Sequence, residues 1–259
     1  MLTPTEIEAF VTRGFVRIEE AFPRAVAEEG RAHLWREAAA ALPGLDADDP
    51  STWTRPVLRF VAPDRPPFRA AGHTERLYEA FDQLAGPGRW RQHAKLGGTV
   101  AVRFPHADPP GDDGWHIDGS WDFEGTYWVN VRSRGRALLV LMLFSDVGPD
   151  DAPTRIRVGS HLRVPRVLEP AGDDGMPFQQ VARRLGSLDA LPIEHATGRA
   201  GDAYLCHPFL VHAADIHRGK VPRFMAQPEL PLLSPFALRE APDDCPPVER
   251  AILLGLRPG

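Results

Sequence analysis

The chain has 259 residues, of which 43% are hydrophobic and 25% charged, and its net charge is −5. These are ordinary values for a globular protein with a substantial core, and they give no sign of a nucleic-acid or anionic-membrane partner. The 27 prolines are scattered through connections, so we expect many short elements joined by rigid turns. No stretch approaches the roughly 18 apolar residues of a membrane span.

The first residues lack the basic flank and apolar core of a secretory signal peptide. Two cysteines, Cys206 and Cys245, are too few for a disulfide framework. We therefore expect a soluble protein of the reducing cytoplasm. The sequence gives no indication of an oligomeric state.

The chain opens with a well-signalled helix. Thr3 is a candidate N-cap, Pro4 suits the first helical position, and Glu6 completes a capping box. Gly14 is expected to end the helix in a left-handed conformation. Alternating residues then predict a strand over Phe15–Ile18.

The rest of the chain divides into a helical part and a β part. Helices are predicted over 23–42 and 73–84, with a proline- and aspartate-rich stretch over 43–67 between them. One helical insertion is predicted over 178–185. Apolar or alternating runs bounded by glycine, proline and aspartate predict five strands, over 99–104, 127–131, 137–144, 204–212 and 223–233.

This order of elements favours a mainly β barrel or sandwich decorated by helices. No linker is visible, so we expect a single domain over 1–259. Within it, residues 1–96 would be mainly helical support and residues 97–235 the β core.

One motif, Gly114-Trp115-His116-Ile117-Asp118-Gly119, places a histidine and an aspartate two positions apart. In an extended segment such side chains point the same way, so His116 and Asp118 can converge on one ion. An isolated H-x-D arises often by chance, and its alternative interpretation is a surface loop. The turn-rich residues 109–114 before it favour a loop that re-enters a strand, a common place for functional residues.

Three histidines, His207, His212 and His217, are candidates for a third ligand. If a hairpin loop follows the second of them, a register that sets His212 opposite Arg223 holds both side chains about 5 Å apart on one face. The same register sets His207 opposite Pro228, which cannot donate to the ladder, and leaves His217 in the loop. The pattern favours His212, with His207 as the second choice.

Two imidazoles and one carboxylate leave three positions of an octahedral ion open on one face. This donor set suits iron(II) in an oxygen-activating enzyme. Arg223 lies in an apolar run, where a guanidinium needs a buried partner. Its fork of donors suits a carboxylate held by two hydrogen bonds, and a 2-oxo-diacid cosubstrate would supply one a few ångströms beyond the metal.

Four segments that span nearly the whole chain carry a more specific pattern. They are Leu2–Ile18, Trp115–Asp118, Val158–His161, and Gly201-Asp202 leading to His212 and Arg223. In these segments the chain resembles the phytanoyl-CoA dioxygenase family of iron(II)- and 2-oxoglutarate-dependent oxygenases. The Gly-Ser-His after a strand and the eleven-residue gap from histidine to arginine make the match stronger than the H-x-D alone.

The resemblance implies a double-stranded β-helix core (jelly-roll or cupin-like) flanked by helices. It implies His116, Asp118 and His212 as iron(II) ligands, Arg223 as the residue that binds the distal carboxylate of 2-oxoglutarate, and O2 as the other cosubstrate. Halogenating relatives replace the carboxylate ligand with a small residue. Asp118 therefore predicts hydroxylation of a small molecule or secondary metabolite, and leaves desaturation and ring formation open.

Other polar residues carry weaker expectations. Ala214 stands two positions after His212, where the family pattern often has a hydroxyl residue, so Thr99 is a candidate hydroxyl partner for the cosubstrate carboxylate. Arg103 could meet cosubstrate or substrate, or be a solvated arginine on the barrel rim. His161 is expected to be a structural turn residue and not a ligand.

The basic residues Arg132, Arg134 and Arg136 could attract an acidic substrate, although alternating arginines on an exposed strand need no such explanation. The lid and the substrate pocket are expected to come from residues 43–67, 120–136 and 165–187. Two other classes stay open: a cupin-like metalloenzyme that does not use 2-oxoglutarate, and a catalytically silent binding barrel. The former would not need the diacid clamp of Arg223.

Overall fold

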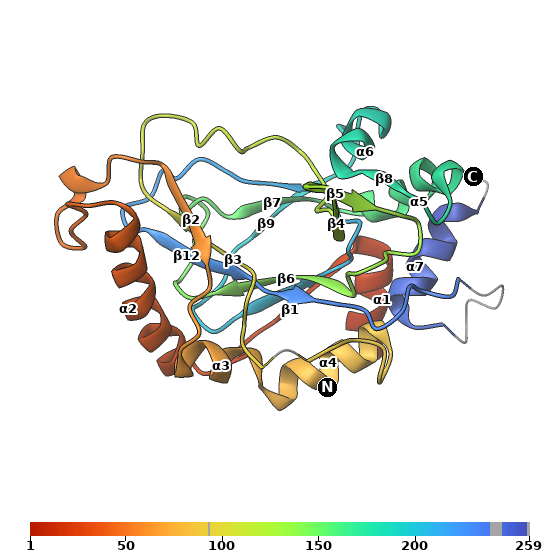
Figure 1. Cartoon of the computed structure of the whole chain (residues 1–259), viewed down its shortest axis with the longest axis horizontal. Coiled ribbons are helices and arrows are strands. Elements are labelled where there is room, and N and C mark those ends of the chain that lie inside the picture. Colours follow the sequence, from red (N-terminus) through yellow and green to blue (C-terminus); the bar gives the residue numbers. More distant parts are fainter. Residues whose placement is uncertain (93, 239–244, 258–259) are drawn as a thin grey trace.

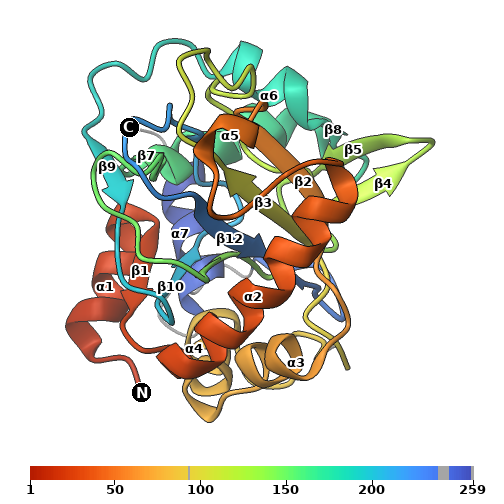
Figure 2. The same ribbon diagram turned by 90° about the vertical axis from the view of Figure 1, so that its left-hand side faces the viewer.

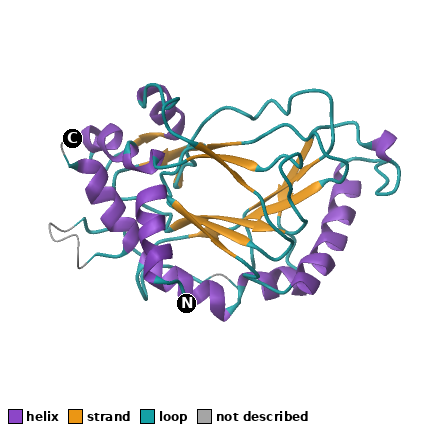
Figure 3. Cartoon of the chain, turned by 180° about the vertical axis from the view of Figure 1, so that it is seen from behind, coloured by secondary structure: helices purple, strands orange, loops and turns teal. Residues whose placement is uncertain are grey.

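Two layers of antiparallel strands form the centre of the protein, and helices cover the outer face of the larger layer (Figures 1 and 3). The computed structural model describes residues 1–259 except 93, 239–244 and 258–259. The larger sheet has the order β1-β10-β6-β12-β3-β2, and β13 also pairs with β6. Its strands are β1 (Phe15–Ile18), β2 (Val57–Val61), β3 (Thr99–Arg103), β6 (Leu138–Leu143), β10 (Ala203–Cys206), β12 (Arg223–Gln227) and β13 (Glu229–Leu230).

Two three-stranded sheets accompany the larger one, with the orders β11-β7-β9 and β4-β5-β8. The first faces the larger sheet, and the second is the hairpin that follows the H-x-D motif, together with a short third strand. Their strands are β4 (Trp121–Phe123), β5 (Thr126–Val129), β7 (Thr154–Arg157), β8 (Met176–Pro177), β9 (Ile193–Ala196) and β11 (His212–Ala213).

The helices lie on the outside of this β core (Figure 2). The first, α1, ends at Gly14 with a φ of 92°, and its capping box between Thr3 and Glu6 is formed as predicted. None of the described helices is long and apolar enough to cross a membrane. The helices are α1 (Pro4–Arg13), α2 (Arg24–Ala41), α3 (Pro66–Gly72), α4 (Glu75–Ala85), α5 (Val164–Leu168), α6 (Phe178–Arg184) and α7 (Pro247–Leu256), with 3-10 turns at η1 (Pro50–Thr52), η2 (Ser160–Leu162) and η3 (Glu169–Ala171).

Strand β6 is buried on both faces, because one face meets the helices and the other meets the smaller sheet. Val140 and Met142 pack into the cluster shared with the helices. Leu139 and Leu141 pack with Ile156 of β7 in the space between the sheets. This explains why the run is continuously apolar, whereas a strand with one wet face would alternate.

The predicted elements are largely present, but several differ in extent, and the strands β4, β7, β8 and β9 were not predicted. The strand predicted over 204–212 is divided into β10 and β11, because a turn at Pro208 and Phe209 interrupts it. The proline- and aspartate-rich stretch over 43–67, for which no strand was predicted, contains β2, which pairs along the whole of β3. The N-terminal third therefore supplies helices and also β1 and β2, the two ends of the strand order of the larger sheet.

The predicted hairpin between His212 and Arg223 is wrong. His212 pairs with Ile156 of β7 in the smaller sheet, while Arg223 pairs with Arg103 of β3 in the larger one. The chain between these residues crosses from one sheet to the other, so the two side chains belong to facing sheets. The choice of His212 as a ligand consequently needs a different explanation.

Candidate metal centre

Three side chains converge at the end of the space between the sheets. His116 and Asp118 come from the loop that follows β3, and His212 begins β11. One potential ligand atom from each residue can be chosen so that all three lie within 4.8 Å of one another. Asp118 Oδ1 is 3.7 Å from Nε2 of His116 and 3.7 Å from Nε2 of His212. The predicted triad is thus brought together.

Each imidazole is oriented by the backbone carbonyl of the residue two positions before it. His116 Nδ1 donates to the carbonyl oxygen of Gly114 at 2.8 Å, and His212 Nδ1 donates to that of Leu210 at 3.0 Å. The proton is therefore held on Nδ1, and the lone pair of each Nε2 faces Asp118. A neutral imidazole fixed in this way is the usual state of a metal ligand.

The two histidines are also paired through their main chains. The amide of His116 donates to the carbonyl of His212 at 3.0 Å, and the reverse hydrogen bond is 2.9 Å. Their rings are 4.6 Å apart. His212 is nearly fully buried, whereas the side chain of His116 is 34% exposed. A ligand can thus approach from the side of His116.

The other two candidate histidines have no ring nitrogen to spare. His207 Nε2 donates to the carbonyl of Val248 at 3.2 Å, and its Nδ1 accepts from the amide of Phe209 at 3.1 Å. His217 Nε2 donates to the carbonyl of Val221 at 2.9 Å, and its Nδ1 accepts from the amide of Gly219 at 3.2 Å. Hydrogen bonding, and not strand register, distinguishes His212 from its neighbours.

The segments that carry the ligands are braced by β7. Arg155 Nε donates to the carbonyl of Ala214 at 2.9 Å, and one of its terminal nitrogens donates to that of Asp113 at 2.7 Å. The Trp115 ring lies against this guanidinium at 4.9 Å and against that of Arg157 at 4.5 Å. One arginine therefore joins the loop before His116 to the chain after His212.

The Gly-Ser-His motif supports the same centre from the other side. Ser160 Oγ accepts the amide of Val211, next to His212, at 2.9 Å. His161 Nε2 donates to the carbonyl of Val11 in α1 at 2.9 Å, as expected of a structural residue. A Cβ on Gly14, the residue that ends α1, would lie 2.5 Å from His161 Nδ1. The position of His161 in the Gly-Ser-His motif therefore requires a glycine at position 14.

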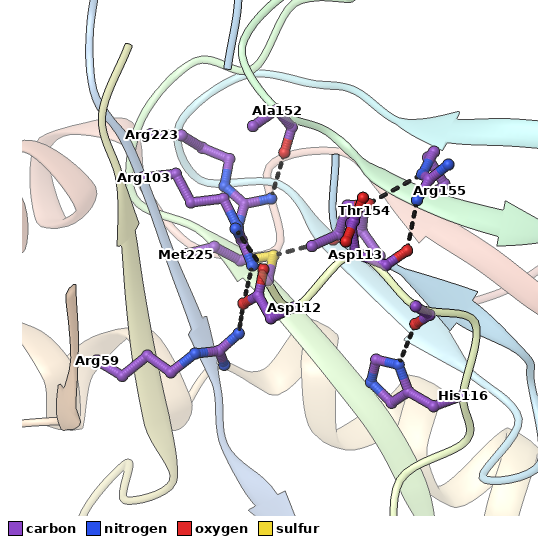
Figure 4. Close-up of polar contacts among 12 residues, drawn as sticks. Arg59, Arg103, Asp112, Asp113, His116, Ala152, Thr154, Arg155, Arg223 and Met225 are labelled. Atoms are coloured by element: carbon purple, nitrogen blue, oxygen red, sulfur yellow. Dashed lines mark hydrogen bonds and ion pairs between the residues drawn. The ribbon is translucent and has the colours of Figure 1, made fainter. Parts of the chain in front are cut away.

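A cluster of arginines lies beside the centre (Figure 4). Arg223 is 2% exposed, and its Nη1 donates to the carbonyl of Ala152 at 2.6 Å, while its buried Nε has no partner among the described residues. Arg103, directly across the strands, holds Asp112 through two hydrogen bonds of 3.0 and 2.7 Å, and Arg59 pairs with the same carboxylate. Two cations, Arg103 and Arg59, thus share the Asp112 carboxylate, and no ion pair with Arg223 is found among the described residues, so Arg223 is available to a further anion.

The electrostatics of these groups follow from burial and neighbouring charge. Burial lowers the pKa of Arg223 well below its usual value, and the Arg103 and Arg59 cations add to this effect. A carboxylate bound next to Arg223 would raise this pKa again, against both burial and the neighbouring cations. Burial alone would raise the pKa of Asp118, but His212 and Arg136 outweigh it and hold that pKa below its usual value. Asp118 is therefore ready to bind a cation.

Thr99 does not join this site. It lies at the opposite end of β3 from Arg103, pairs with Gln227, and is exposed. Sequence reasoning missed Thr154 of β7, which is buried and whose hydroxyl has a described contact only with Met225 Sδ, at 3.7 Å. Met225 lies two residues from Arg223 on β12, so this hydroxyl belongs to the same region (Figure 4).

Comparison with solved structures identifies several proteins of similar fold. The carbocyclase SnoK from nogalamycin biosynthesis is 17% identical, with a TM-score of 0.52 over 89% of this chain and 84% of the other. HygX from Streptomyces hygroscopicus, with nickel, 2-oxoglutarate and hygromycin B bound, is 19% identical, with a TM-score of 0.53 over 90% and 88%. The epimerase SnoN, in complex with Fe3+, alpha ketoglutarate and nogalamycin RO, is 18% identical, with a TM-score of 0.57 over 88% and 82%.

At these identities the likeness shows a shared fold. No curated protein sequence matches the chain significantly. The family model for phytanoyl-CoA dioxygenase, however, matches residues 10–225, a region that includes all three converging side chains and Arg223. The chain belongs to the phytanoyl-CoA dioxygenase family.

Proposed function

We propose that this protein is an iron(II)- and 2-oxoglutarate-dependent oxygenase that hydroxylates an aliphatic C–H bond of a small molecule, with His116, Asp118 and His212 as the iron ligands. The observation that carries the proposal is the pair of free Nε2 atoms, each 3.7 Å from one carboxylate oxygen. Two imidazoles and a carboxylate are the donor set of non-haem iron oxygenases. We also interpret the facing antiparallel sheets as a double-stranded β-helix.

Arg223 is proposed to bind the distal carboxylate of 2-oxoglutarate. A buried guanidinium with an unpartnered Nε needs an anion, and a carboxylate held by a planar fork satisfies it. Thr154 is a better placed hydroxyl partner than Thr99, because its side chain faces Met225, two residues along β12 from Arg223. When bound, iron and 2-oxoglutarate together supply the activation of O2, with release of succinate and CO2.

The protein's own contribution is to position groups and exclude water. The backbone carbonyls of Gly114 and Leu210 accept the Nδ1–H of each imidazole, so that Nε2 is the nitrogen left to bind the metal. Arg155 holds the two ligand-bearing segments together. The target carbon has to lie on the accessible side of the centre, near His116. Rate enhancement then comes from holding that carbon close to the reacting oxygen.

Two further points narrow the reaction. The carboxylate of Asp118 occupies the position that a halogenase leaves to chloride, so we propose oxygen insertion and not halogenation. The bound hygromycin B and nogalamycin RO in HygX and SnoN support a small-molecule substrate for this chain as well. A cytoplasmic location would keep the iron ferrous.

The test is a screen of small molecules for stimulated release of succinate, followed by mass analysis of the product. We expect a substrate to gain one oxygen atom per succinate formed. The Arg223→Met variant should need a 2-oxoglutarate concentration higher by about 30-fold, because a charge-assisted pair is worth about 2 kcal/mol. Turnover of a substrate without 2-oxoglutarate would contradict the proposal and favour a cupin-like metalloenzyme.

A further inference from the structure

Arg136 contacts the carboxylate ligand on the side away from the histidines. Asp118 Oδ1 is the carboxylate oxygen nearest to both imidazoles, while Oδ2 lies 3.7 Å from Arg136 Nη1. The second terminal nitrogen of Arg136 donates to the carbonyl of Gly119 at 2.8 Å. The two oxygens of one carboxylate thus face different partners.

The turn that carries Arg136 is built to make this approach. Ser133 is fully buried, adopts a φ of 47°, and donates from its hydroxyl to the carbonyl of Arg136 at 2.8 Å. Asn130 accepts the amide of Arg134 at 2.9 Å. Gly135 packs so closely on the chain after the H-x-D motif that a Cβ there would lie 2.7 Å from the carbonyl oxygen of Ser120. The turn is therefore locked against the metal-binding loop.

Arg136 also differs from its basic neighbours. Its side chain is only 16% exposed, and its buried Nε has no partner among the described residues. The guanidinium of Arg134, by contrast, belongs to an exposed residue and lies 5.2 Å from the Trp121 ring, away from the ligands. Arg132, Arg134 and Arg136 lie in a turn and not on an exposed strand as predicted, and Arg136 contacts Asp118.

We propose that Arg136 is a positioning residue that binds Oδ2 of Asp118, so that the carboxylate offers only Oδ1 to the metal. This inference rests on the proposed function. A carboxylate free to turn could bind an ion through both oxygens, and the second oxygen would occupy a position that the cosubstrate or O2 needs. The cation on Oδ2 also withdraws charge from the ligand, which makes Asp118 a weaker electron donor.

The experiment compares three variants with the wild-type protein. Arg136→Gln removes the charge but can still donate to Gly119, Arg136→Lys keeps the charge, and Arg134→Gln is the matched control. Each is titrated without oxygen, first with iron(II) and then with 2-oxoglutarate, while the visible charge-transfer band is recorded. Thermal unfolding is measured in parallel.

We expect Arg136→Gln to bind iron(II) about 10-fold more tightly, because a cation beside the site is removed and both oxygens of Asp118 become free to bind the ion. Its charge-transfer band should move to lower energy, because Asp118 then donates more charge to the iron. Arg136→Lys should keep the wild-type band position, and Arg134→Gln should match wild type throughout.

Wild-type iron affinity and band position in Arg136→Gln would overturn the inference. So would weaker binding with an unshifted band and a lower unfolding temperature, since that pattern describes a structural role alone. If the wild-type protein binds iron(II) but gives no band with 2-oxoglutarate, the use of 2-oxoglutarate is contradicted. The role of Arg136 is then still decided by comparing the iron(II) affinities of the wild-type protein and Arg136→Gln. Absence of iron binding by the wild type would contradict both.

Discussion

Two pairs of histidines lie at similar spacings and have opposite roles. The rings of His116 and His212 are 4.6 Å apart, and those of His161 and His207 are 4.9 Å apart. In the first pair, Nδ1 donates to the backbone and Nε2 is free; in the second, Nε2 donates to a backbone carbonyl. The nitrogen that the backbone occupies thus separates a metal ligand from a structural residue.

Charge separates the pairs further. Asp118 lies between the imidazoles of the first pair, whereas the second pair meets backbone carbonyls of Val11 in α1 and Val248 in α7. Burial lowers the pKa of His161 to about 4 and that of His207 well below its usual value. The second pair is therefore kept neutral and fastens two helices to the β core.

The largest expected effect is on the first pair. Asp118→Ala removes the carboxylate to which both Nε2 atoms point, so substrate-dependent succinate formation should fall by more than about 100-fold, beyond the loss typical of a residue that only supports a ligand. The unfolding temperature should change little, because Asp118 is partly exposed. Unchanged activity would show that the ligand assignment is wrong.

The second pair should respond in stability. His161→Ala leaves a cavity and an unpaired carbonyl on Val11, and should lower the free energy of unfolding by about 2–4 kcal/mol. Its affinity for iron(II) should stay near that of wild type. Denaturant unfolding and metal titration on the same sample separate a loss of stability from a loss of iron(II) affinity. If the folded variant no longer bound iron(II), the assignment of His161 and His207 as purely structural residues would be contradicted.

The pH dependence of stability should also come from the second pair. A histidine whose pKa is about 4 when folded and about 6.5 when unfolded binds a proton only in the unfolded state between these values. Stability is therefore complete above pH 6.5 and is lost as the pH falls toward 4, by about 1.4 kcal/mol per unit for each such histidine. Unfolding of a His161→Asn variant should show a shallower slope in this window, and an identical slope would contradict the assignment.

The smallest expected effect is that of replacing Ser160, which lies between the His116–His212 pair and the His161–His207 pair. Ser160 accepts the amide of Val211 beside His212, while its neighbour His161 binds α1. Ser160→Ala leaves a buried amide unpaired, which should cost about 1–2 kcal/mol of stability and weaken iron binding by less than about tenfold. A variant that changes neither quantity would show that the Gly-Ser-His segment does not couple the two pairs.

Local signals in the sequence predicted local structure well. The capping box of Thr3 and Glu6 and the left-handed Gly14 depend on neighbouring residues alone, and α1 follows from them. The H-x-D pair likewise depends on side-chain alternation in one segment. These features need no knowledge of the rest of the chain.

Long-range pairing was harder to predict. The sequence pattern favoured His212 as a ligand through a strand register that sets it opposite Arg223. In the structure these two residues lie on facing sheets, because the intervening chain crosses between them. Strand β2 was missed because proline and aspartate surround it, and its pairing with β3 decides its conformation. The role of Arg136 depends on a turn whose close packing on Ser120 no local pattern reveals.

The most direct test of the central claim is the anaerobic addition of iron(II) and 2-oxoglutarate to the purified protein, with the visible absorption recorded. The wild-type protein and His161→Ala should both give the weak charge-transfer band of iron bound to a 2-oxo acid, and His212→Ala should not. Absence of the band in the wild type, or its persistence in His212→Ala, would contradict the assignment of His116, Asp118 and His212 as the iron site.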